Sequence, residues 1–432
     1  MFNSQLLMRY QVTRVLRALH NTNTLIFAFK RNFMKRTQLT LKCLLLCLSV
    51  FLSLASLQVK GQDTAQTKEE FKASGKLWGY AFGDYAYKLH ADSALRGSVQ
   101  YSRLAKDYNS FNFRRIYLGY DYHFSADITS ELLIAHESAF EADPDNPDVL
   151  TDRNRSLYIK AMNIQFKNVI PRATIIAGQQ PTPTFTTLTD PTWGYRSIEK
   201  SITDMRSISS STDLGIGIFG KIGEGENVGY DVLIGNNNGA KLENNKFKKI
   251  YTSLYAYFID KKLVIQGNFE HDRNARHPYN KEITTVKAFS AYKGSKTTIG
   301  IEAFKQLRTN NAAYLQSAMP IADTGYSDLA SSGISLFIRH ELTKDKLSLF
   351  ARFDLYDPDT KFINDKKYVN GYNDTKESFA TVGLDFTPCK NIHIMPNLWY
   401  NQYHNKLNGA SGSLKNDYDL VGRMTLYFLF NK

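Results

Sequence analysis

Charged side chains recur at alternate positions in segments that are otherwise apolar, and this spacing is the feature of the chain most able to do chemistry. In the last segment, Arg423, Thr425 and Tyr427 alternate with Gly422, Met424, Leu426, Phe428 and Phe430. Successive side chains of a β-strand point to opposite faces, so the alternation predicts one polar and one apolar face. The same rule predicts a polar face bearing Arg115, Asp121, Glu131, Asp231, Glu302, Arg339, Arg352, Asp354 and Arg423. If this polar face lines a channel, its charges can bias which ions pass through the channel. Alternatively, the charges can pair with one another and stabilise the channel wall.

A second group of charges lies in a long link, Gln180–Thr212. This link of 33 residues also holds Pro, Trp and Tyr, which indicates a folded segment with partners. A connection of this length in a compact fold is usually functional. We expect this link to fold into the channel that the polar faces enclose and to narrow it. The expected constriction is formed by Arg196, Glu199, Lys200, Asp204 and Arg206. A cap outside the membrane is the alternative.

The sequence gives no positive support for catalysis, metal binding or a cofactor. Neither GxSxG nor HExxH occurs. Ser335 and His340 have opposite parity on one predicted strand, so they face opposite ways and cannot form a catalytic pair. The acidic stretch 141–148 lacks the Gly and distal Glu of a calcium loop, which favours a solvated loop. We therefore expect a non-enzymatic protein.

The elements that must position these charges are sixteen short alternating segments, from Lys76–Leu89 to Tyr418–Phe430. Short links such as Ser125–Asp127 and Ile259–Lys261 follow the even-numbered segments, and long links follow the odd-numbered ones. This sorting predicts an all-β fold, a transmembrane antiparallel β-barrel of about 16 strands with short periplasmic turns and long extracellular loops. A closed barrel satisfies every backbone polar group within lipid.

The interior of a barrel of this size is expected to hold water rather than a packed core. Tyr and Phe together number 53, and we expect many of them in girdles at the two membrane interfaces. The segment Leu157–Phe166 gives no clear assignment, because both of its faces are mixed.

The N-terminal region carries the targeting information. Lys35 and Arg36 precede the apolar run Leu44–Leu57, and small residues lead to Gly61, a pattern typical of a signal peptide. We predict a signal peptide over 34–61, a mis-called upstream extension over 1–33, a short periplasmic segment over 62–75 and a β-barrel domain over 76–432. A membrane anchor is the alternative for the apolar run, but the run is shorter than the ~20 residues that a spanning helix needs.

Removal of residues 1–61 changes the charge and cysteine content. The region holds nine of the 54 Lys and Arg and none of the 41 Asp and Glu, so the net charge falls from +13 to +4. The remaining basic residues are dispersed and accompany no binding motif, so they give no case for a nucleic-acid partner. Cys389 is left as a lone cysteine, which excludes an intramolecular disulfide.

These features together resemble the Gram-negative outer-membrane porins, in particular the phosphate-selective porin O/P-like group. The resemblance covers the whole mature chain and includes the closing strand that ends in Leu426-Tyr427-Phe428-Leu429-Phe430, although Asn431 and Lys432 follow it here. It implies passive diffusion of small hydrophilic solutes or anions, contact with outer-membrane lipid, a homotrimer and an inward loop that sets selectivity. The loop has three basic and three acidic residues, which departs from the cationic constriction of the phosphate-selective group.

Two other classes remain open. A structural or adhesive barrel would bind partners through its loops and have a blocked lumen. A transporter of hydrophobic substrates would need a lateral opening and an N-terminal plug, for which residues 62–75 are too few.

Overall fold

The computed structural model describes residues 71–97, 99–137, 142–143, 146–150, 156–276, 279–315, 324–362, 367–368, 374–407 and 414–431. The predicted extension, the predicted signal peptide and most of the predicted periplasmic segment lie outside these ranges. For the acidic stretch 141–148 the structure describes backbone only, at 142–143 and 146–148. No helix in the described part of the chain is long and apolar enough to cross a membrane.

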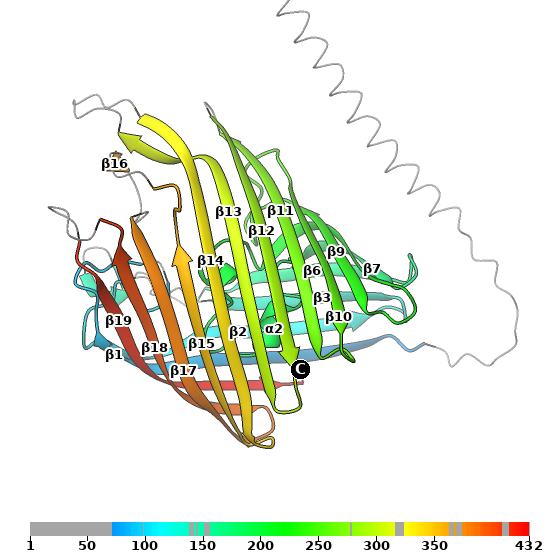
Figure 1. Ribbon diagram of the computed structural model, residues 1–432. Helices are drawn as coiled ribbons and strands as arrows, with labels where there is room; N and C mark the ends of the chain where they lie inside the picture. Colours follow the sequence, from blue (N-terminus) through cyan, green and yellow to red (C-terminus); the bar gives the residue numbers. More distant parts are fainter. Residues whose placement is uncertain are drawn as a thin grey trace, which may run out of the picture. The chain divides into compact units, whose positions relative to one another are not determined.

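Sixteen long antiparallel strands form a closed barrel (Figure 1), which confirms the predicted fold class. Strand β1 closes the sheet, because it pairs with β2 on one side and with β19 on the other. The barrel strands are β1 (Ser74–His90), β2 (Asn109–His123), β3 (Ile128–Glu137), β6 (Tyr158–Lys167), β7 (Ala173–Pro181), β8 (Thr212–Ile222), β9 (Val228–Gly235), β10 (Lys249–Phe258), β11 (Leu263–Arg276), β12 (Tyr279–Lys293), β13 (Thr297–Leu315), β14 (Thr324–Thr343), β15 (Leu347–Asp357), β17 (Thr375–Cys389), β18 (Ile392–Asn405) and β19 (Asp417–Phe430). The short strands are β4 (Ala142–Asp143), β5 (Asn146–Leu150) and β16 (Lys367–Tyr368).

The short turns that the sequence predicts lie at one rim, and the links at the other rim are longer. The exception is the link between β11 and β12, where only two residues separate Arg276 from Tyr279 because both strands continue to that rim. The short-turn rim also holds the start of β1 and the end of β19, where Gly79 pairs with Phe430. At the long-loop rim, β13 runs to Leu315, although its alternation ends near Phe304. Polar and apolar residues are mixed on both faces of this extension, so backbone pairing continues without an alternating pattern to mark it.

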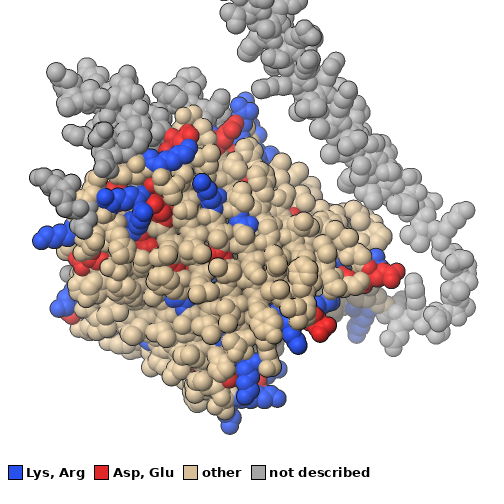
Figure 2. Space-filling view, in the orientation of Figure 1, with Lys and Arg blue, Asp and Glu red and all other residues tan. Residues whose placement is uncertain are grey.

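Apolar side chains cover the outward face of the barrel. On β19, Met424 and Leu426 are 47% and 42% exposed, whereas the inward Arg423 and Thr425 are 5% and 0% exposed. Figure 2 shows most of the charged side chains on the visible face gathered toward the rims, with an uncharged surface between them. This distribution is the one that a barrel in a bilayer requires, because a charge facing lipid near the midplane costs about 2–4 kcal/mol for Arg or Lys.

Several β-bulges or irregularities interrupt the ladders of the described strands, and two of them each turn a cation inward. Arg114 is the extra residue where β2 pairs with β1, and Lys160 is the extra residue where β6 pairs with β3. A bulge places two consecutive residues opposite one partner residue and so shifts the side-chain parity. Both cations are buried, with 4% and 8% exposure. The bulge at Lys160 also explains why the faces of Leu157–Phe166 are mixed in sequence.

Candidate functional site

The link between β7 and β8 lies inside the barrel (Figure 1); we call residues 182–211 the inserted segment. It contains the short helices α2 (Thr189–Trp193) and α3 (Ile202–Met205). Helix α2 ends at Gly194, whose φ of +75° is the left-handed conformation that glycine adopts at little cost. A guanidinium nitrogen of Arg339 fills the space that a Cβ at Gly194 would need, so the turn fits closely against the wall.

One side of the inserted segment packs into a hydrophobic cluster with the wall. Trp193 contacts Phe337 of β14 with ring centroids 5.2 Å apart, and Tyr195 lies 4.4 Å from Phe350 of β15. Ile198 is fully buried in the same cluster. This packing corrects one expectation from the sequence, because part of the lumen is a packed core rather than water. Aromatic residues belong to this core as well as to the outward face.

Polar contacts hold the same side of the inserted segment to the wall. The indole N–H of Trp399 on β18 donates to Glu199 at 3.0 Å, and Arg206 contacts Glu377 of β17 at 2.6 Å. Both Glu199 and Arg206 are buried and line neither of the cavities described below. Their position therefore differs from the expected one, because their side chains turn toward the wall instead of the open lumen.

The nine predicted wall residues have inward parity, but several of them contact the inserted segment rather than line open space. Glu302 accepts a hydrogen bond from Thr203, and Arg352 pairs with Asp354 at 2.5 Å and donates to the carbonyl of Lys200. Arg339 lies against Gly194, Arg423 donates to Asn397 at 2.7 Å, and Asp231 is buried. In the ladder between β2 and β3, Arg115 lies opposite Glu137 and Asp121 lies opposite Glu131. Glu131 also lines one of the cavities described below. The geometry of Glu302, Arg352 and Asp354 fits the bracing role.

The other side of the inserted segment presents a compact group of charges. Arg196 contacts Asp190 at 2.6 Å and Asp204 at 2.5 Å, and Lys200 lies 3.5 Å from Asp204. Burial raises the pKa of Asp190, and the nearby Asp204 carboxylate adds to that rise. Burial also acts to raise the pKa of Asp204, but Lys200 and Arg196 outweigh it and lower the pKa overall. Asp190 is therefore the carboxyl of this pair that takes up a proton first as the pH falls.

The wall opposite this group carries charges of its own. Lys160 contacts Glu137 of β3 at 2.5 Å, and it also donates to the hydroxyl of Ser211 at 3.2 Å. The hydroxyl of Tyr117 on β2 donates to the same carboxylate. Neither Lys160 nor Glu137 was among the sequence candidates. The bulge places Lys160 on the inward face against the alternation of its strand, so the sequence pattern does not assign it there. Glu137 is the last residue of its strand and adjoins a long loop, so the alternation does not assign its direction either.

Two cavities lie between the inserted segment and this wall, one toward each rim. The outer cavity, of about 860 Å³, reaches Lys241 and Asp272 at the long-loop rim. The inner cavity, of about 580 Å³, reaches Trp78 and Tyr427 near the short-turn rim. Their linings share three residues, namely Lys160, Ser211 and Thr212. The two cavities therefore adjoin at the charged group, which lies between the two rims.

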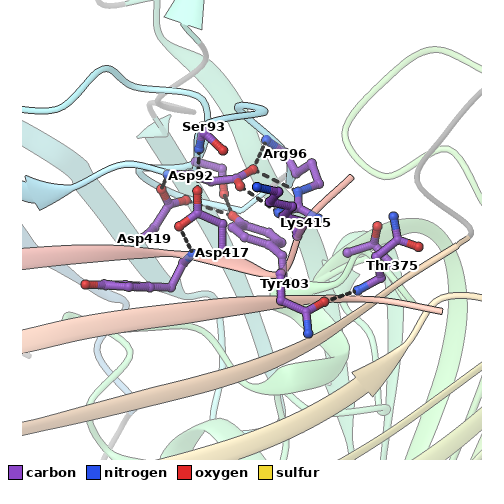
Figure 3. Close-up of polar contacts among 12 residues, drawn as sticks. Asp92, Ser93, Arg96, Thr375, Tyr403, Lys415, Asp417 and Asp419 are labelled. Carbon is purple, nitrogen blue, oxygen red and sulfur yellow. Dashed lines mark hydrogen bonds and ion pairs between the residues drawn. The ribbon is translucent and has the colours of Figure 1, made fainter. Parts of the chain in front are cut away.

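A second loop, residues 91–108, also folds against the inner wall. Figure 3 shows its polar contacts at the long-loop ends of β18 and β19, where Arg96 forms a bidentate pair with Asp92. The backbone N–H of Asp92 donates to Asp419 at 2.9 Å, and Tyr403 donates to the same carboxylate at 2.8 Å. This network fixes the loop against the side of the barrel that the inserted segment also covers.

The described residues show no arrangement that would indicate metal chemistry, since no group of three or more His, Cys, Asp and Glu side chains among them could hold an ion. Ser335 is buried inside the barrel, whereas His340 has the outward parity of Leu336 and Ile338 and lies 2.7 Å from the hydroxyl of Thr297. The two residues therefore face opposite ways, as the sequence predicts.

Comparison with solved structures supports the same architecture. An anion-selective porin from Comamonas acidovorans superposes with a TM-score of 0.55 and 10% identity, covering 83% of this chain and 100% of that one. The outer membrane channel DcaP of Acinetobacter baumannii superposes with a TM-score of 0.57 and 12% identity, covering 83% of this chain and 97% of that one. Salmonella typhi OmpF superposes with a TM-score of 0.51 and 10% identity, covering 83% of this chain and 98% of that one. At such identities the likeness shows the fold alone, which is that of the outer-membrane porins. The sequence matches no family model and no curated protein.

Proposed function

We propose that the protein is an outer-membrane porin, a water-filled channel for passive diffusion of small hydrophilic solutes or ions. The observation that carries the proposal is the pair of adjoining cavities beside the inserted segment, inside a closed barrel with an apolar outer face. Export by the predicted signal peptide, the periplasmic orientation of the short-turn rim, contact with outer-membrane lipid and a homotrimer are parts of the same proposal.

The constriction lies where the two cavities adjoin, with Arg196, Lys200 and Asp204 on the inserted segment facing Lys160 and Glu137 on the wall. Six cations and five carboxylates line the two cavities, namely Lys160, Arg196, Lys200, Lys241, Lys249 and Arg308 against Glu131, Glu137, Asp190, Asp204 and Asp272. This near balance supports weak anion preference. It does not support phosphate selectivity, which a predominantly cationic ring would favour.

A structural or adhesive barrel with a blocked lumen is the second candidate. The packed clusters around Trp193 and around Tyr101 favour it, because they fill much of the interior. The two candidates differ in one measurable property, since only the porin conducts ions through the folded barrel.

The test is single-channel recording of the refolded chain from Gln62 in a planar bilayer. Cys389 is exposed and is first replaced by Ser; Lys200→Cys then places one thiol at the proposed constriction. A bulky thiol reagent is expected to reduce the current in steps. The matched control is Lys246→Cys, on the exposed link after β9, where the reagent should leave the current unchanged. A folded, heat-modifiable barrel without conductance would contradict the porin and favour the blocked barrel.

A further inference from the structure

The inner cavity has an aromatic wall on the three strands where the barrel closes. Trp78, Tyr80 and Phe82 follow one another on the inward face of β1, Tyr117 comes from β2 and Tyr427 from β19; we call these five residues the aromatic patch. Tyr80 is the direct ladder partner of Tyr117, and Phe82 is that of Tyr427. The patch is therefore continuous across three strands.

The rings of the patch are arranged as a series of faces and edges. Trp78 and Tyr80 are stacked with an interplanar angle of 8°, and Tyr80 lies 4.4 Å from Tyr117. Tyr427 meets Phe82 edge to face, with an interplanar angle of 83°. Tyr80 and Tyr427 are partly exposed within the cavity lining. These two rings offer the surface on which a passing solute can lie.

Charged groups complete the lining of the cavity, and each has a partner of opposite sign or an amide. Arg196 is bonded to Asp190, Lys160 to Glu137, and Glu131 accepts from the amide of Asn163 at 3.1 Å. Paired charges present hydrogen-bond donors and acceptors side by side while contributing little net field. The cavity therefore combines flat apolar faces with a neutral but strongly hydrogen-bonding rim.

From this combination we propose, building on the porin function above, that the inner cavity binds saccharides of one or two rings during their passage. The face of a pyranose ring is lined by C–H groups and packs on an aromatic face, while its edge carries hydroxyls that both donate and accept hydrogen bonds. Paired guanidinium and carboxylate groups match such hydroxyls. The volume of about 580 Å³ lies within the ~300–1,000 Å³ range of small-molecule sites.

An aromatic carboxylate is the competing solute, since its ring would also stack on the patch. It would need a cation free to neutralise it, however, and the two cations that line this cavity already contact carboxylates at 2.5–2.6 Å. Binding would require breaking one of these pairs. The geometry therefore favours an uncharged, polyhydroxylated ring.

The experiment measures how added solutes reduce the ion current of the full mature barrel in a planar bilayer. Maltose and glucose are expected to reduce the current reversibly and with saturation. The acyclic polyol mannitol, which has hydroxyls but no ring, should have only the effect of its viscosity. Tyr80→Ala should weaken maltose binding about three- to tenfold, the worth of one aromatic contact, whereas Tyr80→Phe keeps the face and should bind as the parent does.

The matched control is Tyr120→Ala, which removes an outward-facing tyrosine that is 42% exposed, on a strand next to that of Tyr80. It should leave maltose binding unchanged, and each variant must show normal conductance steps before it is scored. Normal conductance steps that maltose does not block saturably would overturn the saccharide site but leave the proposed porin function standing. Saturable block by benzoate but not by maltose would replace the saccharide with an aromatic acid. Absence of any conductance from the folded parent barrel would instead overturn the porin itself.

Discussion

The two sides of the barrel interior follow the same alternation of inward and outward residues, but loops cover one side whereas the other side lines open cavities. On β14, β15, β17 and β18, inward aromatic and charged residues such as Phe350 and Arg352 are buried against the inserted segment. On β1, β2, β3 and β6, inward residues such as Tyr80 and Lys160 line open cavities. The comparison teaches that strand periodicity determines which face a residue occupies, whereas the path of the loops determines whether that face is covered.

The covered side stabilises the inserted segment through packing, and the open side is free to interact with solutes. On the covered side a buried charge is useful only when paired, because an uncompensated buried charge is costly. On the open side water can solvate the charges, so their pairing sets the local field as well as the stability. A substitution should therefore affect stability on one side and selectivity on the other.

The largest effect is expected from Phe350→Ala on the covered side. Phe350 is fully buried against Trp193 and Tyr195, and truncation leaves a cavity that should lower the free energy of unfolding by about 3–5 kcal/mol. Urea unfolding in detergent, followed by tryptophan fluorescence, measures this change. The control is Phe353→Ala on the same strand, which faces outward with 48% exposure and has no part in this cluster. Equal losses in the two variants would mean that the inserted segment contributes little to stability.

The sequence predicts the barrel well because sheet, turns and faces follow local rules. The sixteen strands, the two rims and the inward parity of residues such as Arg423 all come from alternation and turn composition. Local rules fail where one residue is added to a strand. Arg114 and Lys160 are inward only because bulges shift the parity, and no turn residue marks either bulge.

The inserted segment shows the other limit of sequence reasoning. Its length and composition indicate a folded element, and its charges stand out at once. Which charges face the wall depends on partners distant in sequence, such as Trp399 for Glu199 and Glu377 for Arg206. The aromatic patch escapes sequence analysis for a related reason, since Tyr and Phe are also common at membrane interfaces.

A moderate effect is expected from Lys160→Gln on the open side. The change removes one positive charge where the two cavities adjoin, so the reversal potential in a salt gradient should move toward cation preference. At the effective dielectric of a partly buried site the permeability ratio should change at least about twofold, and less at high salt. Lys246→Gln removes an equal charge from an exposed loop and should leave the ratio unchanged. An identical response of the two variants would show that Lys160 does not border the conducting path.

The smallest effect, and the sharpest test of the open side, is the pH dependence of ion preference. The pKa of Asp190 is raised, so its carboxylate is neutralised as the pH falls through that pKa, and the inserted segment changes from neutral to a charge of +1. Anion preference should therefore increase on acidification. In Asp190→Asn the inserted segment carries the charge of +1 at every pH tested. Its anion preference at neutral pH should therefore equal that of the parent at acid pH, and the pH dependence should be reduced. Asp204→Asn is the control, because the pKa of Asp204 is lowered and its carboxylate stays charged over the range in which Asp190 titrates. The pH dependence should persist in this variant but move to lower pH, since the Asp204 carboxylate no longer raises the pKa of Asp190. If Asp190→Asn kept the parent's pH dependence and Asp204→Asn lost it, the assignment of the two carboxylates would have to be reversed.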